Sequence, residues 1–439
     1  MENMKIQFTD KDITPWGGMS LMQNMMEQIG FREKLKTIDL PEQGSNRGYK
    51  PYIIIEAFIA SVWCGANRFL HTEVLRQDNV LTKIFNWERF PGQDSFKRYF
   101  KKFNQTINNR IFNELNRWFF NELKFDNYTL DFDSTILTRY GNQQGAAKGY
   151  NPHKPGRKSH HPLMAFIDDI KMVANFWLRA GNTGASTNFL NFLEDTLSKL
   201  SGKKVGLLRA DSGFFGEEIL EYLETKQINY IIAAKFYPTI KRAIAEARTW
   251  LSLSDGIAIA ETKFKCKEWE KERRIIIIRQ RTDKRPEASG KQITLFGEEI
   301  DHSMYRYSCY VTNLDLPAAV VWRNYRGRAN AENRIKELKY DFGLDSFNMN
   351  NFYATEAALS FAMIAYNLMS LFRQFVMKSD VQNRMSTLRL KTFAIGAYLV
   401  KDGRNLVLTL ALKLKRREWF TGLWNDSKLF TLPVYISNA

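Results

Sequence analysis

The sequence predicts an α/β protein with a mixed β-sheet, preceded by a helical region and followed by a basic one. Residues 127–251 follow the order strand, strand, strand, helix, strand, helix, strand, helix, which is typical of a sheet covered by helices. The 439 residues are 44% hydrophobic, enough to bury a core and to form two or three domains of ~150 residues each. These observations exclude a disordered chain.

The first 125 residues are predicted to be helical, because apolar residues recur there with helical spacing. The recurrence covers residues 19–29, 52–64 and 111–123. After a break at Pro91-Gly92, the segment SFKRYFKKF would form a short helix with a basic exposed side. This pattern indicates DNA docking of the helix-turn-helix type, with an ordinary helical bundle as the alternative. We predict residues 1–125 to be a helical DNA-binding region.

Residues 126–251 are predicted to form the first part of the α/β core. The run YTLDFDST alternates with period two, so Asp131 and Asp133 share one face of a strand and apolar residues occupy the other. The runs PLMAFID and MVANFWL follow as a hairpin. The strand VGLLRAD then ends in Asp211, and helices alternate with one more strand, NYIIAAK.

The remainder is predicted to complete the core and to add a basic region. Residues 252–313 are β-rich and contain a polar stretch that ends at Gly297, which indicates an insertion. Residues 314–376 return to helix, including one helix over 317–340, and are predicted to be core helices. Residues 377–439 form a basic C-terminal region.

The charge balance predicts a polyanion as partner. The chain has 64 Lys and Arg against 47 Asp and Glu, a net charge of +17, and a pI near 9.5. Each phosphate that a basic side chain neutralises releases counterions from a nucleic acid, which favours binding. Residues 384–417 contribute nine Lys and Arg against one acid.

A second concentration of charge lies in residues 134–167, which contain no Asp or Glu. Their several glycines and prolines predict a flexible loop that can wrap phosphates. The basic residues of this loop are Arg139, Lys148, Lys154, Arg157 and Lys158.

The cysteines and the N-terminus predict a soluble cytoplasmic protein. The three cysteines, Cys64, Cys266 and Cys309, are far apart and form no CxxC pair, which argues against disulfides and cysteine-ligated zinc. The first residues are polar and do not form a signal peptide, and we expect no apolar run long enough to span a membrane. The loop histidines, His153, His160 and His161, match no standard zinc spacing.

Three acidic residues are candidates for a metal-dependent site. Two-metal phosphoryl chemistry requires several carboxylates that converge on one point, and hard oxygen ligands suit Mg²⁺ or Mn²⁺. Asp133 and Asp211 lie on predicted strands of one sheet, where strand ends collect ligands. The third is Glu332, in the helix NYRGRANAENRIKELKYDFG. Taken alone, Asp211 would be a helix N-cap and Glu332 a surface partner of Lys336.

The predicted helix over 317–340 carries an unusual stripe. At 100° per residue, Tyr325, Arg328, Glu332 and Lys339 fall within ~60° of one another. Such a stripe is neither a core face nor an ordinary solvated face. It can combine metal binding by the carboxylate with phosphate binding by the two cations.

These residues resemble a known family. Tyr325-x2-Arg328-x3-Glu332-x6-Lys339 resembles the Tyr-Arg-Glu-Lys signature of a group of bacterial insertion-sequence DDE transposases. The segment DSGFF from Asp211 resembles the second-Asp motif of that group, and LDFDST resembles its first-Asp strand. The order Asp, Asp, Glu, with a β-rich insertion before the Glu, also matches.

The resemblance implies a ribonuclease-H-like core with Asp133, Asp211 and Glu332 as catalytic residues that bind two Mg²⁺, which Mn²⁺ can replace. It favours Asp133 over Asp131, because the family's aspartate precedes a pair of small hydroxyl residues. It assigns Tyr325, Arg328 and Lys339 to the DNA end. Trp269, in the insertion, is a candidate for holding a flipped base, with packing as the alternative.

The activity implied is cut-and-paste DNA transposition by a homodimer on paired terminal inverted repeats, often through a hairpin intermediate. Two alternatives stay open: a metal-dependent nuclease or resolvase that acts on branched DNA, and a DNA-binding regulator without activity.

Overall fold

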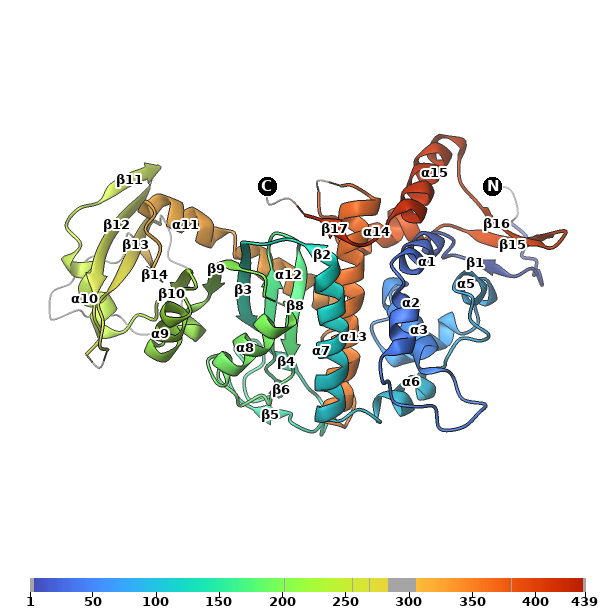
Figure 1. Ribbon diagram of the computed structural model, residues 1–439, viewed down its shortest axis with the longest axis horizontal. Helices are drawn as coiled ribbons and strands as arrows, with labels where there is room; N and C mark the ends of the chain where they lie inside the picture. Colours follow the sequence, from blue (N-terminus) through green and yellow to red (C-terminus); the bar gives the residue numbers. More distant parts are fainter. Residues whose placement is uncertain are drawn as a thin grey trace.

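A nine-stranded mixed sheet forms the centre of the protein (Figure 1). The computed structural model describes residues 4–200, 202–254, 256–267, 269–282, 305–379 and 381–436. The strands, in spatial order, are β11 (Leu251–Ser254), β12 (Ile257–Phe264), β13 (Arg273–Arg281), β14 (Tyr305–Thr312), β10 (Tyr230–Ala233), β9 (Val205–Ala210), β3 (Tyr128–Ser134), β7 (Leu163–Ile167) and β8 (Met172–Trp177).

The strand β3 lies between β9 and β7. It runs parallel to β9, with Phe132 opposite Ala210, and antiparallel to β7, with Asp133 opposite Met164. Since β9 and β10 are also parallel, β3, β9 and β10 end at the same edge of the sheet. The polar stretch that ends at Gly297 lies outside the described residues. The strands of the predicted insertion, β11 to β14, extend the same sheet beyond β10.

Helices cover both faces of the core sheet. They are α8 (Phe189–Lys199), α9 (Glu217–Thr225), α10 (Pro238–Glu246), α11 (Ala318–Arg326), α12 (Ala329–Asp341) and α13 (Phe352–Leu371). The α8 side is apolar, because Phe132 packs edge-on against Phe189 and Phe192. The opposite face of β3, which carries Asp131 and Asp133, is covered by α12. The period-two alternation predicted for this strand is therefore confirmed.

The central helix α13 continues as a π-helical turn, η4 (Phe372–Val376), and packs against both strand β8 of the sheet and the N-terminal helix Pro51–Trp63 (Figure 1). Asn351 caps its start by accepting a hydrogen bond from the Ala354 amide at 2.9 Å. Among the described residues, Phe352–Val376 is the one helix long and apolar enough to cross a membrane, so the prediction of no such segment was wrong. Because 94% of its apolar window is buried inside the structure, its hydropathy is that of a core helix.

The N-terminal region is helical, as predicted. Its helices are α1 (Met19–Gln28), α2 (Phe31–Thr37), α3 (Pro51–Trp63), α4 (Thr72–Leu75), α5 (Asn79–Ile84), α6 (Gln93–Phe100) and α7 (Gln105–Glu122), with a 3₁₀ turn, η1 (Phe69–His71). The short basic segment forms α6, and α3 and α7 pack on α13. DNA docking by this region stays a prediction.

The C-terminal region returns to the N-terminal helices. It contains α14 (Met385–Leu388), the π-helical turn η5 (Arg389–Phe393), β15 (Ala397–Asp402), β16 (Asn405–Leu410), α15 (Leu414–Leu429) and β17 (Val434–Tyr435). Two of its strands pair with strands from earlier in the chain. β15 pairs with β1 (Ile13–Thr14), and β17 pairs with β2 (Leu123–Lys124). Together with the packing of α1 on α15, these pairs join both ends of the chain into one part of the molecule. The predicted domain boundaries stay a prediction.

Candidate active site

Asp133 and Asp211 lie side by side at the ends of two parallel strands. Asp133 is the second-last residue of β3, and Asp211 directly follows β9. Asp133 is 7% exposed, whereas the Asp211 side chain is 40% exposed. Asp211 also caps the 3₁₀ turn η2 (Ser212–Phe214), since its Oδ1 accepts a hydrogen bond from the Gly213 amide at 2.7 Å. Its Oδ2 faces the site.

The third predicted carboxylate, Glu332, contacts the same arginine as Asp133 and Asp211 do. The guanidinium of Arg328 lies 3.1 Å from Asp133 Oδ2, 4.0 Å from Asp211 Oδ2 and 3.6 Å from Glu332 Oε1. The Glu332 side chain is 59% exposed, so α12, which carries it, places it on the solvent side of the site. The structure therefore brings the three predicted carboxylates around one buried cation of the chain itself.

The helix that carries the stripe is interrupted, which the sequence did not predict. Instead of one helix over 317–340, α11 ends at Arg326 and α12 begins at Ala329. The Asn324 carbonyl, which would accept from the Arg328 amide in a continuous α-helix, accepts from Arg209 Nη1 at 2.6 Å. The Arg328 amide bonds to Tyr325 O at 2.9 Å instead, so the backbone tightens to three-residue hydrogen bonds here.

The other stripe residues also face the strand ends. The Tyr325 ring packs on Tyr310 with centroids 4.2 Å apart, and burial raises the pKa of its hydroxyl well above 10.0. Lys339 Nζ donates to the Ile136 carbonyl at 3.0 Å, in the connection that follows β3. Burial lowers the pKa of Lys339. The break between α11 and α12 thus keeps the stripe on one side.

Asp131 belongs to a buried ion-pair network and not to the solvent-facing site. Its two oxygens accept from Arg209 Nε at 2.6 Å and Nη2 at 2.7 Å, and its side chain has no exposed surface. The same Nη2 reaches Asp168 Oδ2 at 2.7 Å, and Asp168 also accepts from Arg334 of α12. Each hydrogen-bonded carboxylate here serves to position β3, β9 and α12. This geometry favours Asp133 over Asp131 as the functional acid.

The environment of the Asp133 carboxyl disfavours its charged form. Burial raises its pKa from the ordinary 3.8 to about 6, the neighbouring Arg328 lowers it, and Asp211 raises it again. The folded protein therefore binds a proton at Asp133 more readily than the unfolded chain does. A raised carboxyl pKa means that stability is lost as the pH rises from about 3.8 to about 6.

We expect the metal-free Asp133→Asn protein to be more stable than the wild type at pH 7.5. At ~1.4 kcal/mol per pH unit, the difference between 3.8 and about 6 sets an upper limit of ~3 kcal/mol for the gain in free energy of unfolding. The gain should shrink as the pH falls through 6 and vanish near pH 4, where the wild-type carboxyl is protonated in both states. Urea unfolding at several pH values measures it. A variant less stable than the wild type at pH 7.5 would contradict the assigned environment.

The donor set suits a divalent cation, but the carboxylates are not arranged around one. Within the described ranges, no group of three His, Cys, Asp or Glu side chains lies close enough to hold a metal ion. The Arg328 guanidinium lies at the point on which the three carboxylates converge. Hard carboxylate oxygens that already surround a positive charge fit Mg²⁺ or Mn²⁺, provided that the guanidinium moves away.

Comparisons with known proteins found a matching family and a similar solved structure. The family described as "Transposase DDE domain group 1" matches residues 1–428. The chain belongs to this family. No curated protein matches the chain. Among solved structures, the cryo-EM structure of a piggyBac transposase synaptic complex with hairpin DNA is similar, with 12% identity and a TM-score of 0.48, over 88% of this chain and 83% of that one.

The basic loop of this DDE transposase is folded, which corrects the prediction of a flexible loop. It forms a small sheet of β4 (Leu137–Thr138), β6 (Lys158–His160) and β5 (Ala147–Lys148). Arg139 is only 2% exposed, because its guanidinium bonds to His160 Nδ1 at 3.1 Å and to the Asp345 carbonyl at 2.7 Å. Arg139 is therefore a structural residue and is wrongly placed among the phosphate-binding ones. The exposed basic residues of the loop are Lys148, Lys154, Arg157 and Lys158.

Trp269 of the transposase packs within the protein. Its ring lies 5.2 Å from Phe215 and 5.4 Å from Phe264, and the Arg273 guanidinium lies 5.1 Å from its centroid. These contacts favour the packing alternative over a base-holding role. Of the loop histidines, His160 and His161 are buried, and His161 Nε2 lies 3.1 Å from Ser134 Oγ, next to Asp133.

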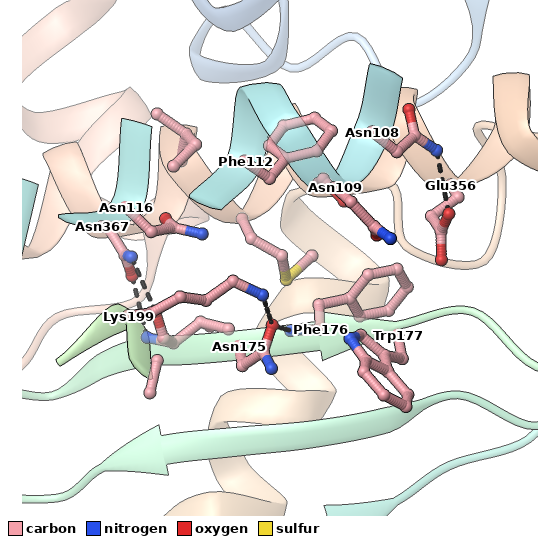
Figure 2. Close-up of a pocket in the computed structure, with 15 residues that line it drawn as sticks. Asn108, Asn109, Phe112, Asn116, Asn175, Phe176, Trp177, Lys199, Glu356 and Asn367 are labelled. Carbon is pink, nitrogen blue, oxygen red and sulfur yellow. Dashed lines mark hydrogen bonds between the residues drawn. The ribbon is translucent and has the colours of Figure 1, made fainter. Parts of the chain in front are cut away.

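A pocket between α7, α8, β8 and α13 is lined by polar and apolar side chains, and several of the polar ones are hydrogen-bonded within the protein (Figure 2). Lys199 Nζ donates to Asn175 Oδ1 at 2.7 Å and to Asp195 Oδ2 at 2.5 Å, while Asn108 donates to Glu356 at 2.8 Å. None of the predicted site residues lines this pocket. Its bonds join the core sheet to α7 and α13, which is a structural role.

Arg209 is the residue that sequence reasoning missed. It is 4% exposed and connects Asp131, Asp168 and the α11–α12 junction. A Cβ at Gly327 would lie 2.5 Å from its Nη1, so any larger residue there would have to displace the end of the Arg209 side chain. One signal was available: a charged residue inside the buried run VGLLRAD requires a buried partner.

Proposed function

We propose that this DDE transposase cleaves DNA at terminal inverted repeats and joins the freed ends to target DNA. The observation that carries the proposal is the convergence of Asp133, Asp211 and Glu332 around the Arg328 guanidinium at one sheet edge. The strand order β8-β7-β3-β9-β10, with β7 antiparallel to its neighbours, supports a ribonuclease-H-like core for this site.

Asp133, Asp211 and Glu332 would hold two divalent cations, Mg²⁺ or Mn²⁺. Bound there, such ions supply a nucleophile from water and stabilise the leaving oxygen of a phosphodiester. Arg328 would move from the carboxylates to a DNA phosphate, which its planar guanidinium can bind through two hydrogen bonds. Lys339 would stabilise the same phosphate by its charge, and Tyr325 would contact the DNA end.

The remaining parts of the proposal concern partners and location. The exposed lysines and arginines of the basic loop would bind the DNA backbone. We also propose a cut-and-paste reaction, with a hairpin on the element or on the flank. The protein would act as a synaptic homodimer that holds two DNA ends. A DNA substrate places the protein inside the cell, and a bacterial cytoplasm stays a prediction.

A cleavage assay tests the proposed function. The purified protein is incubated with labelled DNA that contains both flanks of its gene, with Mg²⁺ or Mn²⁺. We expect nicks at a short inverted repeat and a product in which that end is joined to target DNA. Cleavage of branched DNA irrespective of sequence would instead support a nuclease or resolvase. Specific binding without any cleavage would support a regulator.

A further inference from the structure

We propose that Tyr140 stacks on an unpaired nucleobase of the DNA strand next to the cleavage site. The inference rests on the proposed DNA-cleaving function, and it names the form of DNA that the basic loop recognises. The Tyr140 side chain is 68% exposed, although a ring of this size is usually covered in a folded protein.

Two cations flank the Tyr140 ring. The Lys154 ammonium lies 4.9 Å from the ring centroid and donates to the Tyr140 hydroxyl, and the Arg157 guanidinium lies 5.9 Å from the centroid. The segment contains no acid, and another loop lysine, Lys158, donates to the neutral amide oxygen of Asn142 at 3.2 Å. Among the described residues, Asp345 is the carboxyl whose pKa the charge of Lys154 lowers, and neither Lys154 nor Arg157 forms an ion pair within 4.0 Å. An aromatic face beside such cations matches what a single-stranded nucleic acid requires, a base-stacking surface and phosphate neutralisation.

The backbone around Tyr140 is fixed before any DNA binds. The Arg139 amide donates to the Lys158 carbonyl at 2.8 Å. The buried Arg139 guanidinium donates to the Asp345 carbonyl at 2.7 Å, which fixes the residue before Tyr140. Asn151 bonds to Thr138 Oγ1 at 3.2 Å and accepts from the Lys154 amide at 3.0 Å, which sets the position of Lys154. Preorganisation of this kind lowers the entropic cost of binding.

The position of Tyr140 relates it to the active site. It is seven residues beyond Asp133 on a connection whose Ile136 carbonyl is held by Lys339 of α12. Seven residues span at most ~25 Å, which corresponds to about seven stacked nucleotides. A base stacked on Tyr140 therefore belongs to the same DNA segment as the scissile phosphate, on a stretch where the duplex has opened.

A binding experiment tests the inference without requiring cleavage. Fluorescence anisotropy at physiological ionic strength measures Kd for two probes, a single-stranded oligothymidine of about 12 nucleotides and a blunt duplex of the same length. We expect Tyr140→Ala to raise Kd for the single strand by roughly 10-fold to 100-fold, and for the duplex by less than about 2-fold. Tyr140→Phe and Tyr140→Trp should retain single-strand binding, because both keep an aromatic face.

Tyr150 offers a matched control in the same loop. It is 74% exposed, and no cation lies over its ring among the described residues. Tyr150→Ala should change Kd for either probe by less than about 2-fold, and thermal unfolding checks that the Tyr140 variants fold. Wild-type affinity of Tyr140→Ala for the single strand, or an equal loss with both probes, would overturn the inference. A selective loss in a protein that fails to cleave repeat DNA would uphold base stacking by Tyr140 and reject the proposed function, and with it the position next to a cleavage site.

Discussion

We expect Glu332→Gln to reduce DNA strand cleavage at least ~10³-fold while binding of the DNA end changes by less than about 2-fold. The Glu332 carboxylate is 59% exposed, and its one ion pair with a described residue is the 3.6 Å contact with Arg328, so its loss should not disturb folding. An amide oxygen is neutral, so it is a much weaker ligand for a catalytic divalent cation than the carboxylate that it replaces. Loss of several kcal/mol of transition-state stabilisation corresponds to a factor of this size.

Cleavage of labelled repeat DNA and anisotropy of the same DNA measure the two quantities. Glu218→Gln is the matched control. Glu218 is an exposed acid of α9, and its replacement by glutamine removes the same charge. It should cleave like the wild type. If Glu332→Gln retained cleavage, Glu332 would not belong to the catalytic set.

We expect Asp131→Asn to lower the free energy of unfolding by ~3–5 kcal/mol. Asp131 is fully buried; burial raises its pKa, whereas its two hydrogen bonds with Arg209 lower it. The amide would place an N–H donor against a guanidinium N–H donor and leave the buried guanidinium with Asp168 as its one charged partner among the described residues. Urea unfolding measures the change. Because Arg209 also bonds to the Asn324 carbonyl, we expect cleavage to fall as well when the α11–α12 junction loosens.

Two comparisons make this expectation specific. Glu33→Gln removes the exposed ion pair with Lys36 and should cost at most ~1 kcal/mol. Asp133→Asn, two residues from Asp131, should change stability in the opposite direction at pH 7.5. If Asp131→Asn were as stable as the wild type, the buried network would not carry the structural role assigned to it.

The strands and most helices of the core follow from local sequence pattern. The alternation in YTLDFDST gives β3 its two faces, and VGLLRAD gives β9 and the position of Asp211 after its end. Parallel neighbours then bring Asp133 and Asp211 together. The helix that follows NYIIAAK, α10, ends at Glu246, and Leu251 begins the edge strand β11.

Long-range contacts decided what local pattern could not. The basic loop is acid-free and rich in glycine, which reads as flexible, yet the carbonyl of Asp345 and the side chain of His160 hold Arg139 in place. Trp269 likewise packs against Phe215, a residue far from it in sequence. The residues adjacent in sequence to Arg139 and Trp269 do not predict these distant contacts.

The sequence by itself determined which residues we propose to carry the chemistry, because strand period, helical stripe and residue type are local properties of the chain. Only the tertiary structure decided how those residues are used. Arg209 donates to the Asn324 carbonyl where α11 ends before α12, and Arg328 at this junction lies among the three carboxylates. The contact of Arg209 with the junction joins residues that are 115 positions apart, so local pattern could not predict it.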